Sequence, residues 1–104
     1  MSANLQSSLD GLDRLLHEPA RLMIVTTLYP LDQSDFLYLL RETGLTKGNL
    51  SAHLMKLEEA KYIEIEKTYR GKLPLTLIRL TQQGRTALTD YRNKLKEIME
   101  QIPK

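Results

Sequence analysis

Residues 44–60 read Gly-Leu-Thr-Lys-Gly-Asn-Leu-Ser-Ala-His-Leu-Met-Lys-Leu-Glu-Glu-Ala, and they predict a tight turn followed by a two-faced helix. Gly44 suits the left-handed residue that ends a preceding helix, and Thr46 suits the cap of the next one. A buried helical face is predicted by three leucines at spacings of four and three: Leu50, Leu54 and Leu57. Most other side chains are polar, so the helix has a second face that is free to bind a partner.

The residues before Gly44 predict a shorter helix that packs against this one. It runs from about Ser34 to Thr43, with Ser34 or Asp32 as its cap. Its expected buried face consists of Phe36, Leu37, Leu39 and Leu40. Residues 34–60 therefore predict a helix-turn-helix, whose second helix enters the DNA major groove. Four leucines are expected to hold its two helices at a fixed angle: Leu37, Leu40, Leu50 and Leu54.

The residues after this unit change from helical to strand-like spacing. Residues 62–69 are rich in β-branched and aromatic types, residues 70–74 read as a turn, and residues 75–80 as a returning strand. Residues 62–80 thus predict a β-hairpin, the wing. Between residues 67 and 80 the chain has no acidic residue and four basic ones: Lys67, Arg70, Lys72 and Arg79. Such a local excess of positive charge suits a phosphate backbone.

The chain outside these units predicts three more helices. Residues 5–16 carry one apolar stripe, Leu5, Leu9, Leu12 and Leu16, which Glu18-Pro19 interrupts. Pro19 then opens a largely apolar helix, Pro19–Leu28, that we expect in the core. The last helix begins at Thr81, runs to about Ile102 and carries a heptad seam of Leu88, Tyr91, Leu95, Ile98 and Ile102.

The two terminal stripes have two possible partners, their own domain or a second chain. We predict that they form a dimer interface, because the seam continues to Ile102, further than a domain of this size needs covering. Leu5, Leu9 and Leu12 are assigned to the same interface. A two-fold dimer would place two recognition helices about 34 Å apart, one turn of DNA.

Length and composition exclude several classes of protein. The 104 residues predict one domain over residues 1–104, mainly α with a small β-hairpin, that is, a winged helix-turn-helix (α+β) with extra terminal helices. There is no cysteine, no apolar run of membrane length and no signal peptide at the start, so we expect a cytoplasmic protein. No catalytic set, phosphate loop, cofactor motif or cluster of metal ligands is present, and the two histidines, His17 and His53, are expected on different helices. We expect neither an enzyme nor a metal or cofactor site.

Candidate DNA contacts follow from the polar face of the second helix and from the hairpin. Lys47, Asn49, Ser51 and His53 are placed to reach base edges, since Asn suits adenine and Lys suits guanine. Thr46 and the helix start can receive a phosphate, and Gly48 would let the helix approach the DNA backbone. Arg70 and Lys72 flank Gly71 at the hairpin tip, and Lys67 begins the acid-free run. His53 has a second interpretation, as a surface or packing residue.

These residues carry a family resemblance. The run 44–60, followed by Tyr62-Ile-Glu-Ile-Glu-Lys67 and Leu80-Thr-Gln-Gln-Gly84, resembles the small winged-helix transcription regulators related to the MarR and ArsR groups, over roughly residues 12–91. The resemblance implies a homodimer on a near-palindromic operator, with wing contacts from Arg70 and Lys72. It also implies DNA contacts from Thr46, Lys47, Asn49, Ser51, His53 and Lys56.

One departure from the family concerns the end of the recognition helix. Members often have glycine after the Glu-Glu-Ala that ends it, whereas this chain has Lys61. A left-handed lysine would cost about 1 kcal/mol relative to glycine, so the exit geometry is expected to differ. Metal-sensing members use clustered Cys or His, which this chain lacks.

The sequence thus predicts a sequence-specific double-stranded DNA-binding regulator, a dimeric repressor. The alternative is a winged-helix module that binds another protein and no DNA. The acid-free hairpin favours the first interpretation, because a protein-binding surface has no need to stay positive. A groove between the terminal helices and the helix-turn-helix leaves room for an unidentified small-molecule effector, although no residue demands one.

Overall fold

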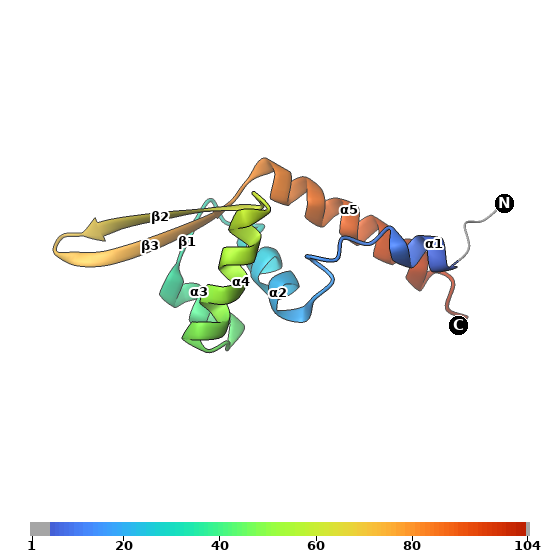
Figure 1. Cartoon of the computed structure of the whole chain (residues 1–104), viewed down its shortest axis with the longest axis horizontal. Helices are drawn as coiled ribbons and strands as arrows, with labels where there is room; N and C mark the ends of the chain where they lie inside the picture. Colours follow the sequence, from blue (N-terminus) through green and yellow to red (C-terminus); the bar gives the residue numbers. More distant parts are fainter. Residues whose placement is uncertain (1–4, 104) are drawn as a thin grey trace.

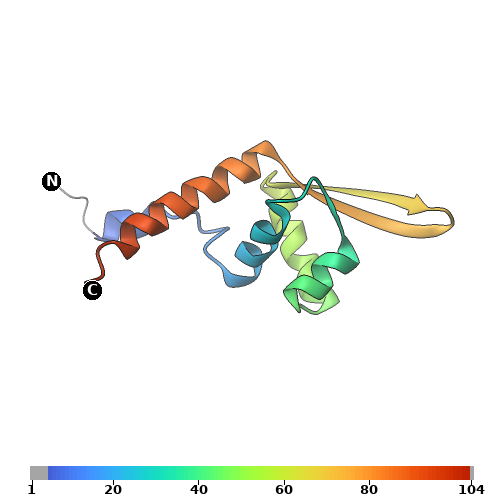
Figure 2. The same cartoon turned by 180° about the vertical axis from the view of Figure 1, so that it is seen from behind.

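The computed structural model describes residues 5–103 and contains five helices and three strands in that part of the chain (Figure 1). In chain order they are α1 (Leu5–Asp10), α2 (Pro19–Leu28), β1 (Ser34–Asp35), α3 (Phe36–Thr43), α4 (Lys47–Glu59), β2 (Ile63–Arg70), β3 (Leu73–Leu80) and α5 (Gln82–Met99). Helices α2, α3 and α4 cluster together, the hairpin β2–β3 projects to one side, and α5 extends to the other with α1 beside its far end (Figures 1 and 2). The predicted α+β winged-helix fold is confirmed.

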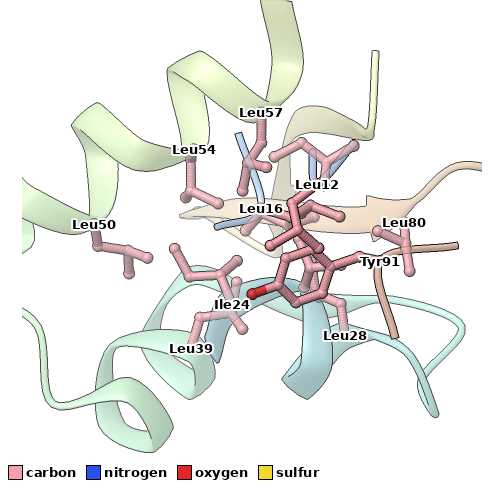
Figure 3. Close-up of a cluster of buried hydrophobic side chains, with 13 residues drawn as sticks. Leu12, Leu16, Ile24, Leu28, Leu39, Leu50, Leu54, Leu57, Leu80 and Tyr91 are labelled. Carbon is pink, nitrogen blue, oxygen red and sulfur yellow. The ribbon is translucent and has the colours of Figure 1, made fainter. Parts of the chain in front are cut away.

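The core is formed by one cluster of buried apolar side chains. Every helix and strand contributes to it except α1 and the two-residue strand β1. Leucines of α4 point toward α2 and α3, as Figure 3 shows, and Ile63 and Ile78 close the cluster from the sheet. Its fully buried members include Leu16, Ile24, Val25, Leu28, Leu39, Leu50, Leu57, Ile63 and Ile78. Burial of such side chains stabilises the fold by about 1.5–3 kcal/mol each.

The helix starts follow the predicted capping chemistry, with one correction. Thr46 Oγ1 accepts from Asn49 N at 3.1 Å, so the predicted cap is confirmed. The last helix, predicted to begin at Thr81, begins at Gln82, and Thr81 caps it, because its Oγ1 accepts from Gly84 N at 3.0 Å. Helix α3 is capped by Asp35, whose Oδ1 accepts from Tyr38 N at 2.7 Å. The predicted cap at Ser34 or Asp32 was wrong, because Ser34 belongs to strand β1 and pairs with Ile78.

Two predicted helical stripes are also corrected. Helix α1 ends at Asp10 rather than near Leu16, because Asp13 Oδ1 accepts from Leu15 N and Leu16 N and folds the following residues into a turn. This turn, rather than a helix, carries Leu12 and Leu16 into the core. Leu37 is 63% exposed, so it does not hold the two helices of the helix-turn-helix together as predicted. Leu40, on the same helix, is half-buried and packs against the core.

The sheet has the strand order β1-β3-β2 and is antiparallel throughout. The hairpin register runs from Ile63 opposite Leu80 to Arg70 opposite Leu73. Only Gly71 and Lys72 connect the strands, and Gly71 has φ 63°, the positive value that a two-residue hairpin turn requires. The predicted hairpin is confirmed, whereas strand β1 was not foreseen because its two residues are too short for an alternating pattern.

The junction between α4, the wing and α5 is built on one backbone carbonyl, that of Tyr62. It accepts from Thr81 N at 3.0 Å and from Thr81 Oγ1 at 3.1 Å. A Cβ on Gly84 would lie 2.2 Å from this oxygen, so only glycine fits there. This geometry explains the Leu-Thr-x-x-Gly motif that opens the last helix.

The end of α4 keeps the left-handed geometry that glycine usually provides, although the residue is Lys61, with φ 66°. Lys61 N donates to Glu58 O (2.9 Å) and Tyr62 N to Leu57 O (3.0 Å), the bond pair of a Schellman motif. The expectation that the exit geometry would differ was therefore wrong. The hydrogen bonds of the motif and the packing of Tyr62 hold a lysine in a conformation that it disfavours.

We predict that Lys61→Gly stabilises the protein. Glycine adopts positive φ without strain, so the free energy of unfolding should rise by about 1 kcal/mol. Chemical denaturation would measure it, with Lys61→Ala as the matched control that removes the side chain and keeps the strain. Equal stability of the glycine and alanine variants would contradict this explanation.

Candidate nucleic-acid interface

Helix α4 presents one stripe of residues directly opposite its buried leucines. With about 100° between successive residues, Gly48, Ala52, Met55 and Glu59 lie on the side facing away from Leu50, Leu54 and Leu57. All four are exposed. We call Gly48, Ala52, Met55 and Glu59 the outer stripe of α4. Any partner that meets this helix face-on meets the outer stripe first.

The predicted contact residues of α4 lie on its two flanks and at its start. Thr46, Lys47, Gly48, Asn49, Ser51 and Lys56 are all exposed. Asn49 and Lys56 occupy the flank toward α2, and Ser51 the flank toward the wing. Sequence reasoning missed Ala52 and Met55, although the helical spacing of the leucines already places both on the outer stripe.

His53 lies apart from these residues, turned toward α2. Its Nδ1 is 3.3 Å from an Arg21 guanidinium nitrogen and 4.0 Å from Glu18 Oε1. Arg21 is itself fixed, because its Nε donates to Leu15 O at 2.6 Å. This geometry favours the packing interpretation of His53 over direct base contact.

A groove separates α4 from the inner face of the wing and brings predicted contacts from both elements together. Its volume is about 640 Å³. Ser51 comes from α4, and Lys67 and Thr76 come from facing positions of β2 and β3. Phe36, Leu54, Met55 and Ile65 form its apolar walls. Ser51 and Lys67, which are distant in sequence, therefore line one surface.

The end of the wing carries exposed cations and two exposed apolar side chains. Arg70 and Lys72 are exposed, as are Tyr69 and Leu73, each at 70%. The fourth basic residue of this stretch differs, because Arg79 pairs with Glu66 at 2.7 Å and also bonds Gln33. The charge that the wing offers to a partner therefore comes from Lys67, Arg70 and Lys72.

A partly buried polar network lies on another side of the molecule, where Tyr62 and the α5 residue Tyr91 meet the turn at residues 11–17. Tyr62 OH donates to Asp13 Oδ2, and burial together with this hydrogen bond raises the pKa of Tyr62 to about 12. Tyr91 OH bonds His17 Nδ1 at 2.8 Å, and burial also raises the pKa of Tyr91. These groups connect elements of the fold and do not reach the outer stripe.

Neither a metal centre nor a membrane span is found in the part of the chain that the structure describes. Residues 5–103 hold no group of three or more His, Cys, Asp or Glu placed to bind a metal ion. Within the same residues, no helix combines the length and the apolar character needed to cross a bilayer.

The residues predicted for a dimer interface separate into three groups. Leu5, Leu9 and Ile102 are exposed. Leu88, Leu95 and Ile98 are half-buried against the core. Leu12 and Tyr91 are 5% and 4% exposed, so these two belong to the core of a single chain and their assignment to a dimer interface is corrected.

Helix α4 and the wing lie within a stretch of the chain that matches a known family. Residues 20–99 match the family model of the winged helix DNA-binding domain. This chain belongs to that family. The predicted resemblance to winged-helix transcription regulators is confirmed, and the family is one of DNA-binding domains rather than of enzymes.

Several relatives and solved structures are similar to this member of the family. The uncharacterized protein MJ0432 of Methanocaldococcus jannaschii is 33% identical over 89 residues, which cover 86% of this chain and 97% of the relative. A transcriptional regulator homologue from Pyrococcus horikoshii OT3 is 25% identical, with a TM-score of 0.82 over 92% of this chain and 93% of that one. An Enterococcus faecalis V583 protein assigned to the MarR family shares the fold at 22% identity, with a TM-score of 0.71 over 96% and 89% of the two chains.

Gly48 is the one position of α4 where a functional reason for the residue can be separated from a folding reason. Among the described residues, no atom lies within 4 Å of a Cβ built on Gly48, and its φ is not positive. Glycine within a helix costs about 0.5–1 kcal/mol relative to alanine. The fold therefore gains nothing from this glycine, and its benefit is expected at a bound partner.

We predict that Gly48→Ala raises the free energy of unfolding by about 0.5–1 kcal/mol and weakens binding to duplex DNA. Thermal or chemical denaturation and fluorescence anisotropy would measure the two effects. Gly84→Ala is the contrasting control, since its Cβ would collide with Tyr62 O and destabilise the fold. Undiminished DNA affinity of Gly48→Ala would exclude close approach of a duplex at this point.

Proposed function

We propose that this chain is a homodimeric repressor that binds a near-palindromic double-stranded DNA operator in the cytoplasm. One observation carries the proposal: Ser51 and Met55 of α4 line one groove with Lys67 of the wing, and Arg70 and Lys72 are exposed at the wing end. In this proposal residues 34–60 form the DNA-reading unit, residues 62–80 the wing, and residues 81–102, which contain α5, the dimerisation segment of a single domain.

Direct DNA contacts are assigned according to exposure. Asn49 and Lys56 contact base edges or phosphates from one flank of α4, and Lys47 and Ser51 contact them from the other. Thr46 and Gly48 lie at the helix start, where backbone N–H groups favour a phosphate. Lys67, Arg70 and Lys72 bind the phosphates beside the major groove or the adjacent minor groove.

The shape of the chain supports the dimer. Its radius of gyration is 15.9 Å, with extents of 60 × 24 × 21 Å, whereas a compact chain of about 100 residues has a radius near 13 Å. The excess length comes from the wing at one end and from α1 with the end of α5 at the other (Figure 1). Four large apolar side chains are exposed at this second end: Leu5, Leu9, Met99 and Ile102. A second copy would cover them.

Repression follows from occupancy, because a dimer that covers its operator excludes other proteins from the same DNA. The small-molecule effector stays a prediction. A groove of about 330 Å³ does lie between α2 and α5, where Thr26, Tyr29, Leu88 and Arg92 are among its lining residues. Nothing in that groove specifies a ligand.

The first experiment tests DNA binding by anisotropy of a labelled random duplex at several salt concentrations. Affinity should fall steeply with salt, because each phosphate contact releases counterions. Arg70→Gln should reduce the log–log slope by about 1. The matched control, Arg92→Gln, removes the same charge from α5 and should leave the slope unchanged. Absence of binding at low salt would favour the protein-interaction alternative.

The second experiment tests the dimer by light scattering coupled to size exclusion at micromolar concentration. We expect twice the mass of one chain for the unaltered protein. Leu9→Glu places a charge among the exposed apolar residues at the α1 end and should shift the protein toward monomer, because burying an unpaired carboxylate is costly. Leu37→Glu is the control, because Leu37 is an exposed leucine on α3 (63% against 48% for Leu9), and this variant should remain dimeric. A monomeric parent protein would contradict the proposal.

A further inference from the structure

The centre of the outer stripe of α4 carries no hydrogen-bonding side chain. Gly48, Ala52 and Met55 occupy it in succession, and Met55 is 59% exposed. The polar candidates, Asn49 and Ser51, stand on the flanks. A helix that enters a major groove along this stripe therefore brings apolar atoms to the middle of its binding site.

Base edges in the major groove offer these atoms one matching feature. Guanine, cytosine and adenine present donors and acceptors there, whereas thymine also presents its C5-methyl group. An alanine or methionine beside a donor or acceptor would desolvate it without replacing its hydrogen bond, which is unfavourable. Beside a methyl group the same side chains bury apolar surface, and the thioether of Met55 adapts readily to such contacts.

The spacing of the stripe fits a short run of base pairs. Residues 48–55 span about 10 Å at 1.5 Å per residue, the height of about three base pairs at 3.4 Å each. Gly48, without a side chain, lets the start of the helix come close to the DNA. Ala52 and Met55 then face the groove floor about one and two turns further along.

We propose that Ala52 and Met55 recognise thymine C5-methyl groups at the centre of each operator half-site, so that thymine is specified there by apolar contact. This inference rests on the proposed DNA-binding function and adds the base class that α4 reads. Asn49 and Ser51 then supply polar contacts on either side of these thymines.

The test removes single methyl groups from the DNA. An operator is first selected from a random duplex pool with the full chain. Each thymine of a half-site is then replaced by deoxyuridine, which pairs identically and lacks only the methyl group. For the unaltered protein, affinity should fall about fourfold at one or two central thymines, the effect of one buried methyl-sized group.

Protein variants assign the effect to residues. Met55→Ala should bind the thymine and deoxyuridine duplexes equally at the position that Met55 reads, and Ala52→Gly at the position that Ala52 reads. Ser51→Ala is the matched control on the neighbouring flank and should keep the full thymine preference. Circular dichroism of each variant checks that the fold is retained.

The possible outcomes distinguish a failure of methyl recognition from a failure of the proposed DNA binding. Selected operators that tolerate every deoxyuridine would overturn methyl recognition and leave DNA binding intact. A thymine preference that survives unchanged in both Met55→Ala and Ala52→Gly would overturn the assignment to these residues. Failure to select any DNA would overturn the proposed function itself.

Discussion

The packing of the α4 leucine stripe is the constraint on which the rest of the structure depends. Leu50, Leu54 and Leu57 fill the space between α2, α3 and the sheet. Because a helix has fixed angular spacing, the burial of one side determines which residues face solvent. The same three side chains that close the core therefore also fix the outer stripe, and a register change in α4 would alter stability and recognition together.

A second constraint joins the two ends of this elongated chain. Residues 60–62 end α4 and lead directly into the first strand of the wing. The backbone carbonyl of Tyr62 accepts hydrogen bonds from Thr81, the residue that caps α5. The close approach of Gly84 to Tyr62 leaves little space for independent movement of these elements. Tyr62 also bonds Asp13 in the turn that follows α1. One short segment thus connects the recognition helix to both terminal helices, a contiguous physical route between the proposed DNA and dimer surfaces.

Much of this arrangement could be predicted from the sequence, because periodicity and capping are local. The leucine spacing located α4, and Pro19 with the apolar residues after it located α2. Thr46 and Thr81 marked two helix starts, and the glycine at position 71 marked the hairpin turn. The failures have identifiable causes. The side chain of Asp13 ends the first helical stripe early through a local turn, and sheet pairing with Ile78 draws Ser34 out of α3. Helical spacing predicts neither a turn capped by a side chain nor pairing with a distant strand. Nor does it contain the contact of His53 with Arg21 of α2, which favours one of the two interpretations of His53.

The positions that disobey local rules fall into two kinds, and the difference indicates where function acts. Lys61 is strained, but hydrogen bonds within the chain explain why its conformation persists. Gly48, Met55 and Leu73 have no such explanation, since each is exposed in the single chain. A residue that is unfavourable for its local structure, and that no contact within the chain explains, is expected at a functional surface. All three lie on α4 or at the wing end, so the argument from stability and the argument from charge reach the same surface independently.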